Sequence, residues 1–314
     1  MFCSEERQAT GGPGLFGQHI GLSAEQRRAL VRRAFDLGIN VFDTAQGYTG
    51  CEAMLAQALE GLPRSEYVLS TKWDHVEWKS PRGVGGQDGP VKQDPNALAE
   101  GVEHSLGELR TDYLDVFFLH GVRPEQYDEV VERFGPVAER LRQQGKIRGV
   151  GLSERYIVDP KHEAIVRGLE DHLQLWDVVM LKYGILNQWA AREALPLAEK
   201  HGTGVMNMAA VRIKLPDPAK LAQLIGEWKE RGLIAHDSLP ATDPLGFLVR
   251  DGMPSVVAAA YKFGADHPAV ATLLTGTTSI AHLEENVAAL APPMLPAADK
   301  QRLTDLFGHI AEYV

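Results

Sequence analysis

Residues 114–152 read LDVFFLHGVRPEQYDEVVERFGPVAERLRQQGKIRGVGL. The segment begins with an apolar run at Leu114–His120 and ends with a second one at Ile147–Leu152, and both runs are typical of buried strands. Between them, apolar residues recur at helical spacing over Tyr127–Gln144. A strand, a helix and a strand in this order predict two parallel strands joined by a crossover helix.

The same alternation continues on both sides of this segment. Further strands are expected at Asn40–Ala45, Tyr67–Lys72, Val178–Tyr183, Thr203–Met208 and Ala271–Thr275. Further helices are expected at Ala24–Leu37, Ala97–Arg110, Pro160–Leu169 and Arg192–His201. Seven or eight such repeats without a linker favour an α/β fold of the closed (β/α)8 TIM-barrel type, in one domain over residues 1–314.

One part of a barrel is weak in this sequence. A barrel needs a first strand before the helix at Ala24, but residues 1–20 read MFCSEERQATGGPGLFGQHI, which is mostly a loop rich in Gly and Pro. The N-terminal hairpin and first strand are therefore predicted to be missing or degenerate. Long loops are expected at Trp73–Asp94, Val211–Ala219 and Gly232–Pro254, and long loops in compact domains usually carry function or cover a site.

The composition excludes several classes of protein. The net charge of −10 disfavours nucleic acids and anionic membranes as partners, because both need basic surfaces. The polar, acidic start lacks the pattern of a signal peptide, and no apolar run reaches the length of a membrane helix. Two cysteines, Cys3 and Cys51, are too few for a disulfide framework. We expect a cytoplasmic protein that is a monomer or a small homo-oligomer.

Polar side chains stand at the ends of three successive predicted strands. Asp43 ends the strand that leads into Tyr48, Lys72 ends the next, and His120 ends the third. Barrel enzymes carry their chemistry at these strand ends, so the four side chains are expected to converge. A lysine ammonium stabilises tyrosinate, a carboxylate holds the lysine, and a histidine polarises a carbonyl. Hydride has to come from a cofactor, because no side chain donates it.

These motifs resemble those of the aldo-keto reductase superfamily. The segment from Phe42 to Glu52 resembles its Asp-Thr-Ala signature, Leu106–Asp115 ending in His120 resembles its second signature, and Gly145–Ser153 resembles its fifth-strand segment. The resemblance implies that Tyr48 is the general acid/base, that Lys72 and Asp43 tune it, and that His120 orients the carbonyl. It also implies an NAD or NADP cofactor across the barrel mouth.

The implied cofactor residues both follow and depart from the family pattern. They are Ser153, Met180, Met208, Gly276, Thr277, Thr278, His282, Glu285 and Asn286. Met208 stands where the family often has a tyrosine against the nicotinamide, while Glu154 and Met180 replace carboxamide-binding Asn and Gln. Members that prefer NADP carry Arg or Lys around Gly276, Thr278 and His282, and a 2′-phosphate needs such partners. Their absence here favours NAD or dual use.

Two interpretations of function remain open at this stage. The first is an active oxidoreductase that acts on an aldehyde, ketone or aldose, with Trp73 lining the substrate site. The second is a redox-degenerate barrel that binds a nucleotide as a structural or regulatory subunit. The retained set of Asp43, Tyr48, Lys72 and His120 favours the first, since a scaffold has no use for it. No metal site is expected, because Asp74, His75 and Glu77 lack a second ligand group at suitable spacing.

Overall fold

The computed structural model describes residues 22–48, 50–78, 88–212 and 214–314. The chain divides into two compact units. The first contains the described residues of Met1–Arg155, Glu163–Met180 and Gly276–Leu283, and the second contains Tyr156–His162, Leu181–Thr275 and Glu284–Val314. The weak first strand predicted within residues 1–20 lies outside the described residues, and the single domain over residues 1–314 stays a prediction.

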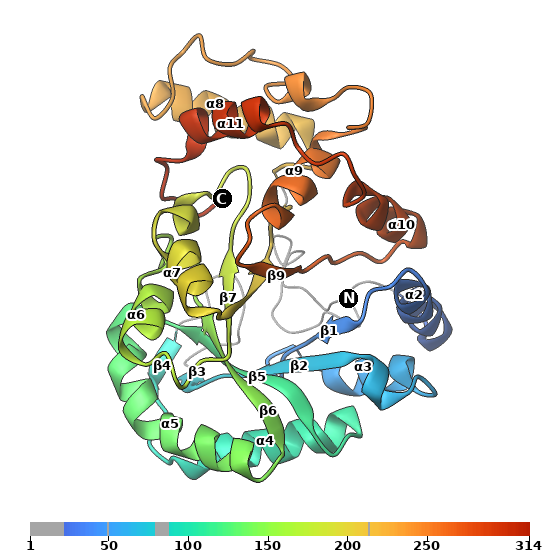
Figure 1. Ribbon diagram of the computed structural model, residues 1–314, viewed down its shortest axis with the longest axis vertical. Helices are drawn as coiled ribbons and strands as arrows, with labels where there is room; N and C mark the ends of the chain where they lie inside the picture. Colours follow the sequence, from blue (N-terminus) through green and yellow to red (C-terminus); the bar gives the residue numbers. More distant parts are fainter. Residues whose placement is uncertain (1–21, 49, 79–87, 213) are drawn as a thin grey trace. The chain divides into compact units, whose positions relative to one another are not determined.

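The first unit is built on parallel strands. They are β1 (Val41–Asp43), β2 (Val68–Trp73), β5 (Leu114–Val122), β6 (Ile147–Glu154) and β7 (Val178–Lys182), whose last two residues belong to the second unit. Each of these strands pairs in parallel with the next, as Figure 1 shows for β1, β2, β5 and β6. Their carboxyl ends therefore lie at one edge of the sheet.

Helices alternate with the strands of this unit. They are α2 (Ala24–Asp36), α3 (Cys51–Leu59), η2 (Arg64–Glu66), α4 (Asn96–Leu109), η3 (Pro124–Gln126), α5 (Tyr127–Gln143) and α6 (Glu163–Asp171). Ser23 caps α2 in a capping box with Gln26, because each side chain accepts a hydrogen bond from the other residue's backbone N–H. Helices α2 to α5 contact one another in sequence order.

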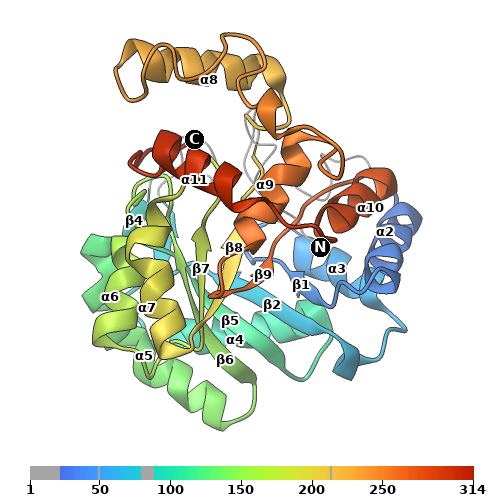
Figure 2. The same ribbon diagram turned by 45° about the horizontal axis from the view of Figure 1, so that its top comes forward.

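The second unit holds the later elements. They are η4 (Trp189–Arg192), α7 (Ala194–His201), β8 (Gly204–Met208), α8 (Pro218–Glu230), η5 (Gly246–Leu248), α9 (Val256–Ala265), β9 (Val270–Leu273), most of α10 (Ile280–Ala289), and α11 (Ala297–Phe307). Strands β8 and β9 pair in parallel, and α9 packs on β9 (Figure 2).

The strand order confirms the predicted fold class. In the seven-stranded sheet the order is β1-β2-β5-β6-β7-β8-β9. The strands of this sheet therefore lie side by side in the order in which they occur in the chain, as in an α/β barrel. The predicted strands and helices agree with the structure to within a few residues at their ends. The exception is Trp73–Asp94, predicted as a loop, which contains an antiparallel hairpin of β3 (Val76–Trp78) and β4 (Asp88–Val91).

The core of the first unit lies between its strands and its helix layer. Phe117 and Phe134 are almost completely buried there, and the indole Nε1 of Trp176 donates a hydrogen bond to the Tyr127 hydroxyl over 3.1 Å. Buried polar groups of this kind require such partners. Across the described parts of the chain, no helix combines the length and the apolar character that a membrane span needs.

Candidate active site

The carboxylate of Asp43 and the ammonium of Lys72 meet at the edge of the sheet where β1 and β2 end. The parallel register sets Asp43 opposite Ser70, whose hydroxyl donates to Asp43 Oδ1 over 2.7 Å. Lys72 Nζ donates to Asp43 Oδ2 and, over 2.8 Å, to the carbonyl oxygen of Thr44. Both charged side chains are more than 90% buried. The ammonium is therefore held in one place by oxygens on two sides.

Tyr48 and His120 complete the group of four side chains. The Lys72 ammonium lies 5.6 Å from the centroid of the Tyr48 ring. The Tyr48 and His120 rings meet edge to face, with centroids 6.0 Å apart and ring planes at 82°. Each of the two residues keeps only 8% of its surface exposed. The structure thus brings together Asp43, Tyr48, Lys72 and His120 within one compact unit.

The turn that carries Tyr48 is fixed by backbone hydrogen bonds. The Gln46 amide donates to the carbonyl of Lys72 over 3.1 Å, which extends the pairing of β1 with β2 beyond the end of β1. The Tyr48 amide then donates to Ala45, and the Cys51 amide to Tyr48. Gly50, with φ at +74°, starts α3 in the left-handed region that favours glycine. The phenol is therefore positioned by the strand rather than by a free loop.

The buried carboxylate of Glu52 connects the elements around the Tyr48 turn. Its Oε1 accepts hydrogen bonds from the hydroxyls of Thr71 and Ser105, each over 2.7 Å. Burial raises the pKa of Glu52, and the two hydroxyl donors oppose that rise. The side-chain amide of Gln46 also donates a hydrogen bond from its Nε2 to the Ser105 hydroxyl, over 2.8 Å. Helix α3, strand β2 and helix α4 are joined by these contacts beneath the Tyr48 turn.

Asp74 is a residue of the site that the sequence analysis did not single out for catalysis. Its Oδ1 lies 3.1 Å from His120 Nδ1, and its Oδ2 accepts a hydrogen bond from the indole of Trp78 over 3.1 Å. A signal was available in the sequence. Side chains alternate along a strand, so the residue two positions after Lys72 projects to the same side. Asp74 thus belongs with the polar group at this sheet edge.

Trp73 projects to the other side and packs in the helix layer. Its ring meets Phe134 of α5 edge to face at 5.0 Å, and Lys92 Nζ lies 4.6 Å from its centroid. A Cβ added at Gly101 of α4 would come within 2.5 Å of the Trp73 ring. The predicted contact of Trp73 with substrate therefore does not agree with its packing, because the ring is enclosed by α4 and α5.

The expected cofactor residues fall into separate groups. Ser153 of β6 and Met180 of β7 are buried and stand opposite each other in the sheet. Met208 ends β8, next to Asn207, whose side chain is tied to the main chain of Tyr183 and Gly264. The amide of Asn286 donates to the Thr275 hydroxyl over 2.9 Å.

A hydrogen bond between a backbone amide and a threonine hydroxyl organises the segment before α10. Thr277 Oγ1 accepts from the Ser279 amide over 3.1 Å. Gly276, His282 and Glu285 are exposed, and Thr278 is partly exposed. Backbone amides at a helix N-terminus are suited to anions, and no Arg or Lys occurs in residues 276–283.

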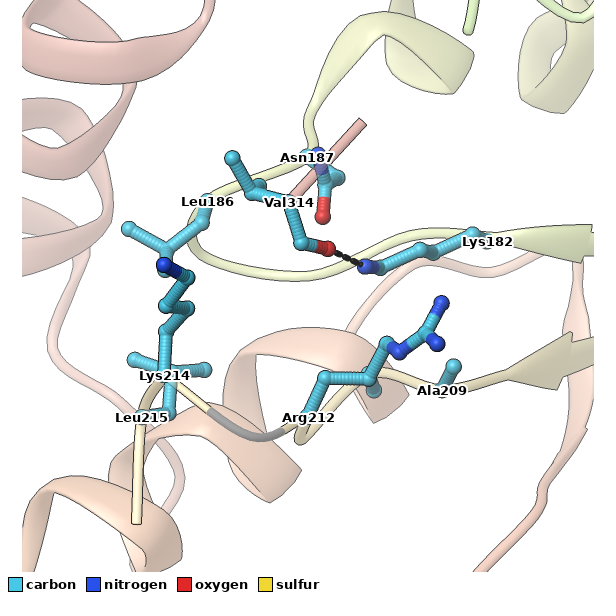
Figure 3. A pocket seen from close by; sticks show the side chains of 9 residues that line it. Lys182, Leu186, Asn187, Ala209, Arg212, Lys214, Leu215 and Val314 are labelled. Atoms are coloured by element: carbon cyan, nitrogen blue, oxygen red, sulfur yellow. Dashed lines mark hydrogen bonds between the residues drawn. The ribbon is translucent and has the colours of Figure 1, made fainter. Parts of the chain in front are cut away.

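A cation-lined pocket in the second unit was not singled out by the sequence analysis (Figure 3). Lys182, Arg212 and Lys214 line it together with Asn187 and the last residue, Val314, and no Asp or Glu side chain is among its lining residues. Lys182 is 3% exposed, and its Nζ donates to the Val314 main-chain oxygen. The available signal was that Lys182 is the last residue of β7 and that Arg212 and Lys214 stand in the segment that follows β8. Within the described ranges, no three His, Cys, Asp or Glu side chains gather in a way that could hold a metal ion.

Comparison with known proteins identifies the family to which the chain belongs. The family model for the aldo/keto reductase family matches residues 9–306. The chain is 29% identical to an NADH-specific methylglyoxal reductase of Escherichia coli, over 83% of this chain and 81% of that one.

Solved structures agree with this result. An aldo-keto reductase from Bacillus halodurans in its holo form is similar with a TM-score of 0.68 at 25% identity, over 93% of this chain and 90% of that one. One from Klebsiella pneumoniae in complex with NADPH has a TM-score of 0.60 at 25% identity, over 90% and 85%. The chain belongs to the aldo/keto reductase family and is an oxidoreductase.

Proposed function

We propose that this protein transfers hydride between NAD(P) and a small aldehyde, ketone or aldose, with Tyr48 as the general acid/base. The observation that carries this proposal is the convergence of Asp43, Lys72, Tyr48 and His120 at one edge of the sheet. A free tyrosine has a pKa near 10 and is a poor proton carrier at neutral pH. A fixed ammonium beside its ring stabilises the tyrosinate that forms when the phenol gives up its proton.

The roles of the four side chains follow from their contacts. In reduction, Tyr48 donates its phenolic proton to the carbonyl oxygen of the substrate, and in oxidation it accepts a proton from the alcohol. Asp43 keeps the Lys72 ammonium charged and in place through a buried ion pair. His120 donates a hydrogen bond to the carbonyl oxygen and orients it. Burial of all four side chains strengthens these interactions, because little water competes with them.

The donor groups present fit a nicotinamide dinucleotide. Ser153 offers a buried hydroxyl for the carboxamide, and the backbone amides before α10 suit a phosphate. When bound, this cofactor supplies the hydride. We propose NAD or dual use, since residues 276–283 offer no cation for a 2′-phosphate and one relative is NADH-specific.

The cofactor is tested by titrating the purified protein with NADH and with NADPH while the cofactor fluorescence is followed. Binding of either, with displacement by its oxidised form, is expected, and tighter NADH binding supports the proposed preference. Turnover is then measured on methylglyoxal, simple aldehydes and ketones, and a panel of aldoses. If neither cofactor binds, the proposal is wrong. Binding without turnover on any of these compounds indicates a barrel that has lost its redox activity.

A further inference from the structure

We infer that Ser105 of α4 is a positioning residue for Tyr48, because its hydroxyl joins the two sides of the turn that carries the phenol. Gln46 stands two residues before Tyr48 in the chain, and Glu52 stands four residues after it. Both side chains bind the same hydroxyl, that of Ser105. This inference rests on the proposed function of Tyr48, and it assigns a role to a helix residue outside the group of four side chains.

The direction of each hydrogen bond follows from the donors that are available. The carbonyl of Gly101, four residues before Ser105 in α4, can only accept, so the Gln46 atom that contacts it is the amide nitrogen Nε2. The same nitrogen lies 2.8 Å from Ser105 Oγ, which therefore accepts there. The single hydroxyl hydrogen of Ser105 is then donated to Glu52 Oε1, which lies 2.7 Å away. The three side chains thus form a chain of hydrogen bonds in one direction.

Burial makes this chain of hydrogen bonds costly to break. Ser105 is completely buried, and Glu52 is only 3% exposed. The loss of a partner by a buried polar group is not compensated by water. Glu52 Oε1 also accepts a hydrogen bond over 2.7 Å from the hydroxyl of Thr71, the residue before Lys72 in β2. The network therefore links the Tyr48 turn to the strand that carries the Lys72 ammonium.

A fixed turn matters for the proposed proton transfer. The phenol of Tyr48 has to stay beside the Lys72 ammonium, which lies 5.6 Å from the ring centroid. A displacement of reacting groups by about 1 Å costs on the order of 100-fold in rate. Backbone hydrogen bonds hold the turn from within, and the Ser105 hydroxyl holds it from α4. Ser105 thus acts on the reaction through Tyr48.

Amide hydrogen exchange, measured residue by residue by NMR, tests the inference directly. The backbone amides of Gln46, Tyr48 and Cys51 donate within this turn or to β2, so their exchange rates report local opening of the turn. Ser105→Ala removes the acceptor for Gln46 and one donor to Glu52. The three turn amides are therefore expected to exchange about 10- to 100-fold faster than in the wild type. The amides of β5 should change only by the loss of global stability.

Tyr127→Phe is the matched control. It also removes a buried hydroxyl, one that accepts a hydrogen bond from Trp176, and it lies in a helix of the same unit. The loss of stability, measured by urea denaturation, is expected to be comparable for the two variants. In Tyr127→Phe the turn amides should keep their wild-type exchange rates relative to the β5 amides. Faster exchange confined to the turn in Ser105→Ala is then due to the place of Ser105 in the network.

Kinetics provide the second readout. Ser105→Ala is expected to lower kcat for carbonyl reduction roughly 10- to 100-fold, while cofactor affinity, followed by fluorescence, is nearly unchanged. Tyr127→Phe is expected to leave kcat unchanged. Gln46→Met keeps the length of the side chain and removes the amide, so it should act in the same direction as Ser105→Ala. The double variant should lose little more activity than Ser105→Ala alone, because both changes break the same link.

The outcomes separate this inference from the proposed function. Turn amides that keep their wild-type exchange relative to β5 in Ser105→Ala, or additive losses of kcat in the double variant, overturn the inference. Gln46 is partly exposed, so Gln46→Met carries the same exchange test if Ser105→Ala is too unstable to purify. A protein without turnover would contradict the proposed function, yet it would still show the faster exchange of the turn amides.

Discussion

The Lys72 ammonium lies 5.6 Å from the centroid of the Tyr48 ring and is bonded to the buried carboxylate of Asp43. This relationship links the chemistry of a tyrosine to a lysine of strand β2 that stands 24 residues later in the sequence. It exists because the parallel pairing of β1 with β2 brings the two strand ends side by side. Charge held this close to a phenol stabilises the deprotonated ring.

Replacement of the phenol tests its role in proton transfer. Tyr48→Phe removes the hydroxyl and retains the ring that contacts His120, so turnover is expected to fall by roughly 10²- to 10⁴-fold or more. The affinity for NADH or NADPH, measured by fluorescence quenching, is expected to stay nearly unchanged. A Tyr48→Phe protein that turns substrate over at the wild-type rate would contradict the assigned mechanism.

The buried ion pair has a predicted effect on stability. Asp43→Leu leaves the Lys72 ammonium buried without its carboxylate, and loss of one partner of a buried pair costs on the order of 3–5 kcal/mol. The double variant Asp43→Leu with Lys72→Met removes both charges, so it is expected to recover part of the free energy of unfolding. Urea denaturation of the three proteins checks this. Equal stability of the wild type and the single variant would show that the pair has no structural role.

The burial of His75 leads to a prediction about the stability of the protein in acid. Burial lowers the pKa of His75 to about 4 from its ordinary value of 6.5, while the hydrogen bond to Gln126 and the charge of Asp74 oppose the change. The unfolded chain therefore binds a proton that the folded chain does not bind between these values. The contribution of His75 to the free energy of unfolding is therefore fully present above pH 6.5. It falls by about 3 kcal/mol as the pH is lowered towards 4.

A pair of variants isolates this effect. His75→Gln keeps a donor for Gln126 but cannot titrate, so its free energy of unfolding should depend less on pH between 4 and 6.5. His104→Gln replaces an exposed histidine of α4 and should retain the wild-type dependence. Urea unfolding at half-unit pH steps measures both. Identical slopes for wild type and His75→Gln would rule out His75 as the acid-sensitive group.

The packing of Trp73 predicts a change in stability that leaves substrate affinity unaffected. A Cβ at Gly101 would come within 2.5 Å of the Trp73 ring, so Gly101→Ala is expected to destabilise the protein by about 1–3 kcal/mol. Trp73→Leu in the same chain should relieve the overlap and restore part of that loss. Thermal unfolding checks the stability, and KM checks the site. If Trp73→Leu alone changes KM strongly, then Trp73 contacts substrate after all.

The sequence by itself determined the strands, the helices and the residues at the strand ends. Apolar runs and helical spacing are local, so the strands and helices that the sequence analysis gives with bounds agree with the structure to within a few residues at their ends. The helices α3, α8 and α9 and the β3–β4 hairpin were not among them. The same locality identified Asp43, Tyr48, Lys72 and His120, because successive parallel strands deliver their last residues to one edge. Alternation along β2 also separates Lys72 from Trp73, and that signal in the sequence was available but not used.

Only the tertiary structure decided how distant residues meet. The antiparallel pairing of β3 with β4 joins segments whose sequences look like a loop. The approach of Asp74 to His120 depends on the register of β2 with β5, and the gathering of Lys182, Arg212 and Lys214 depends on where the segments that follow β7 and β8 run. The Asp74–His120 contact and the gathering of Lys182 with Arg212 and Lys214 join residues far apart in the chain, so no local pattern specifies them. They follow from strand register and side-chain packing, which the whole chain determines together.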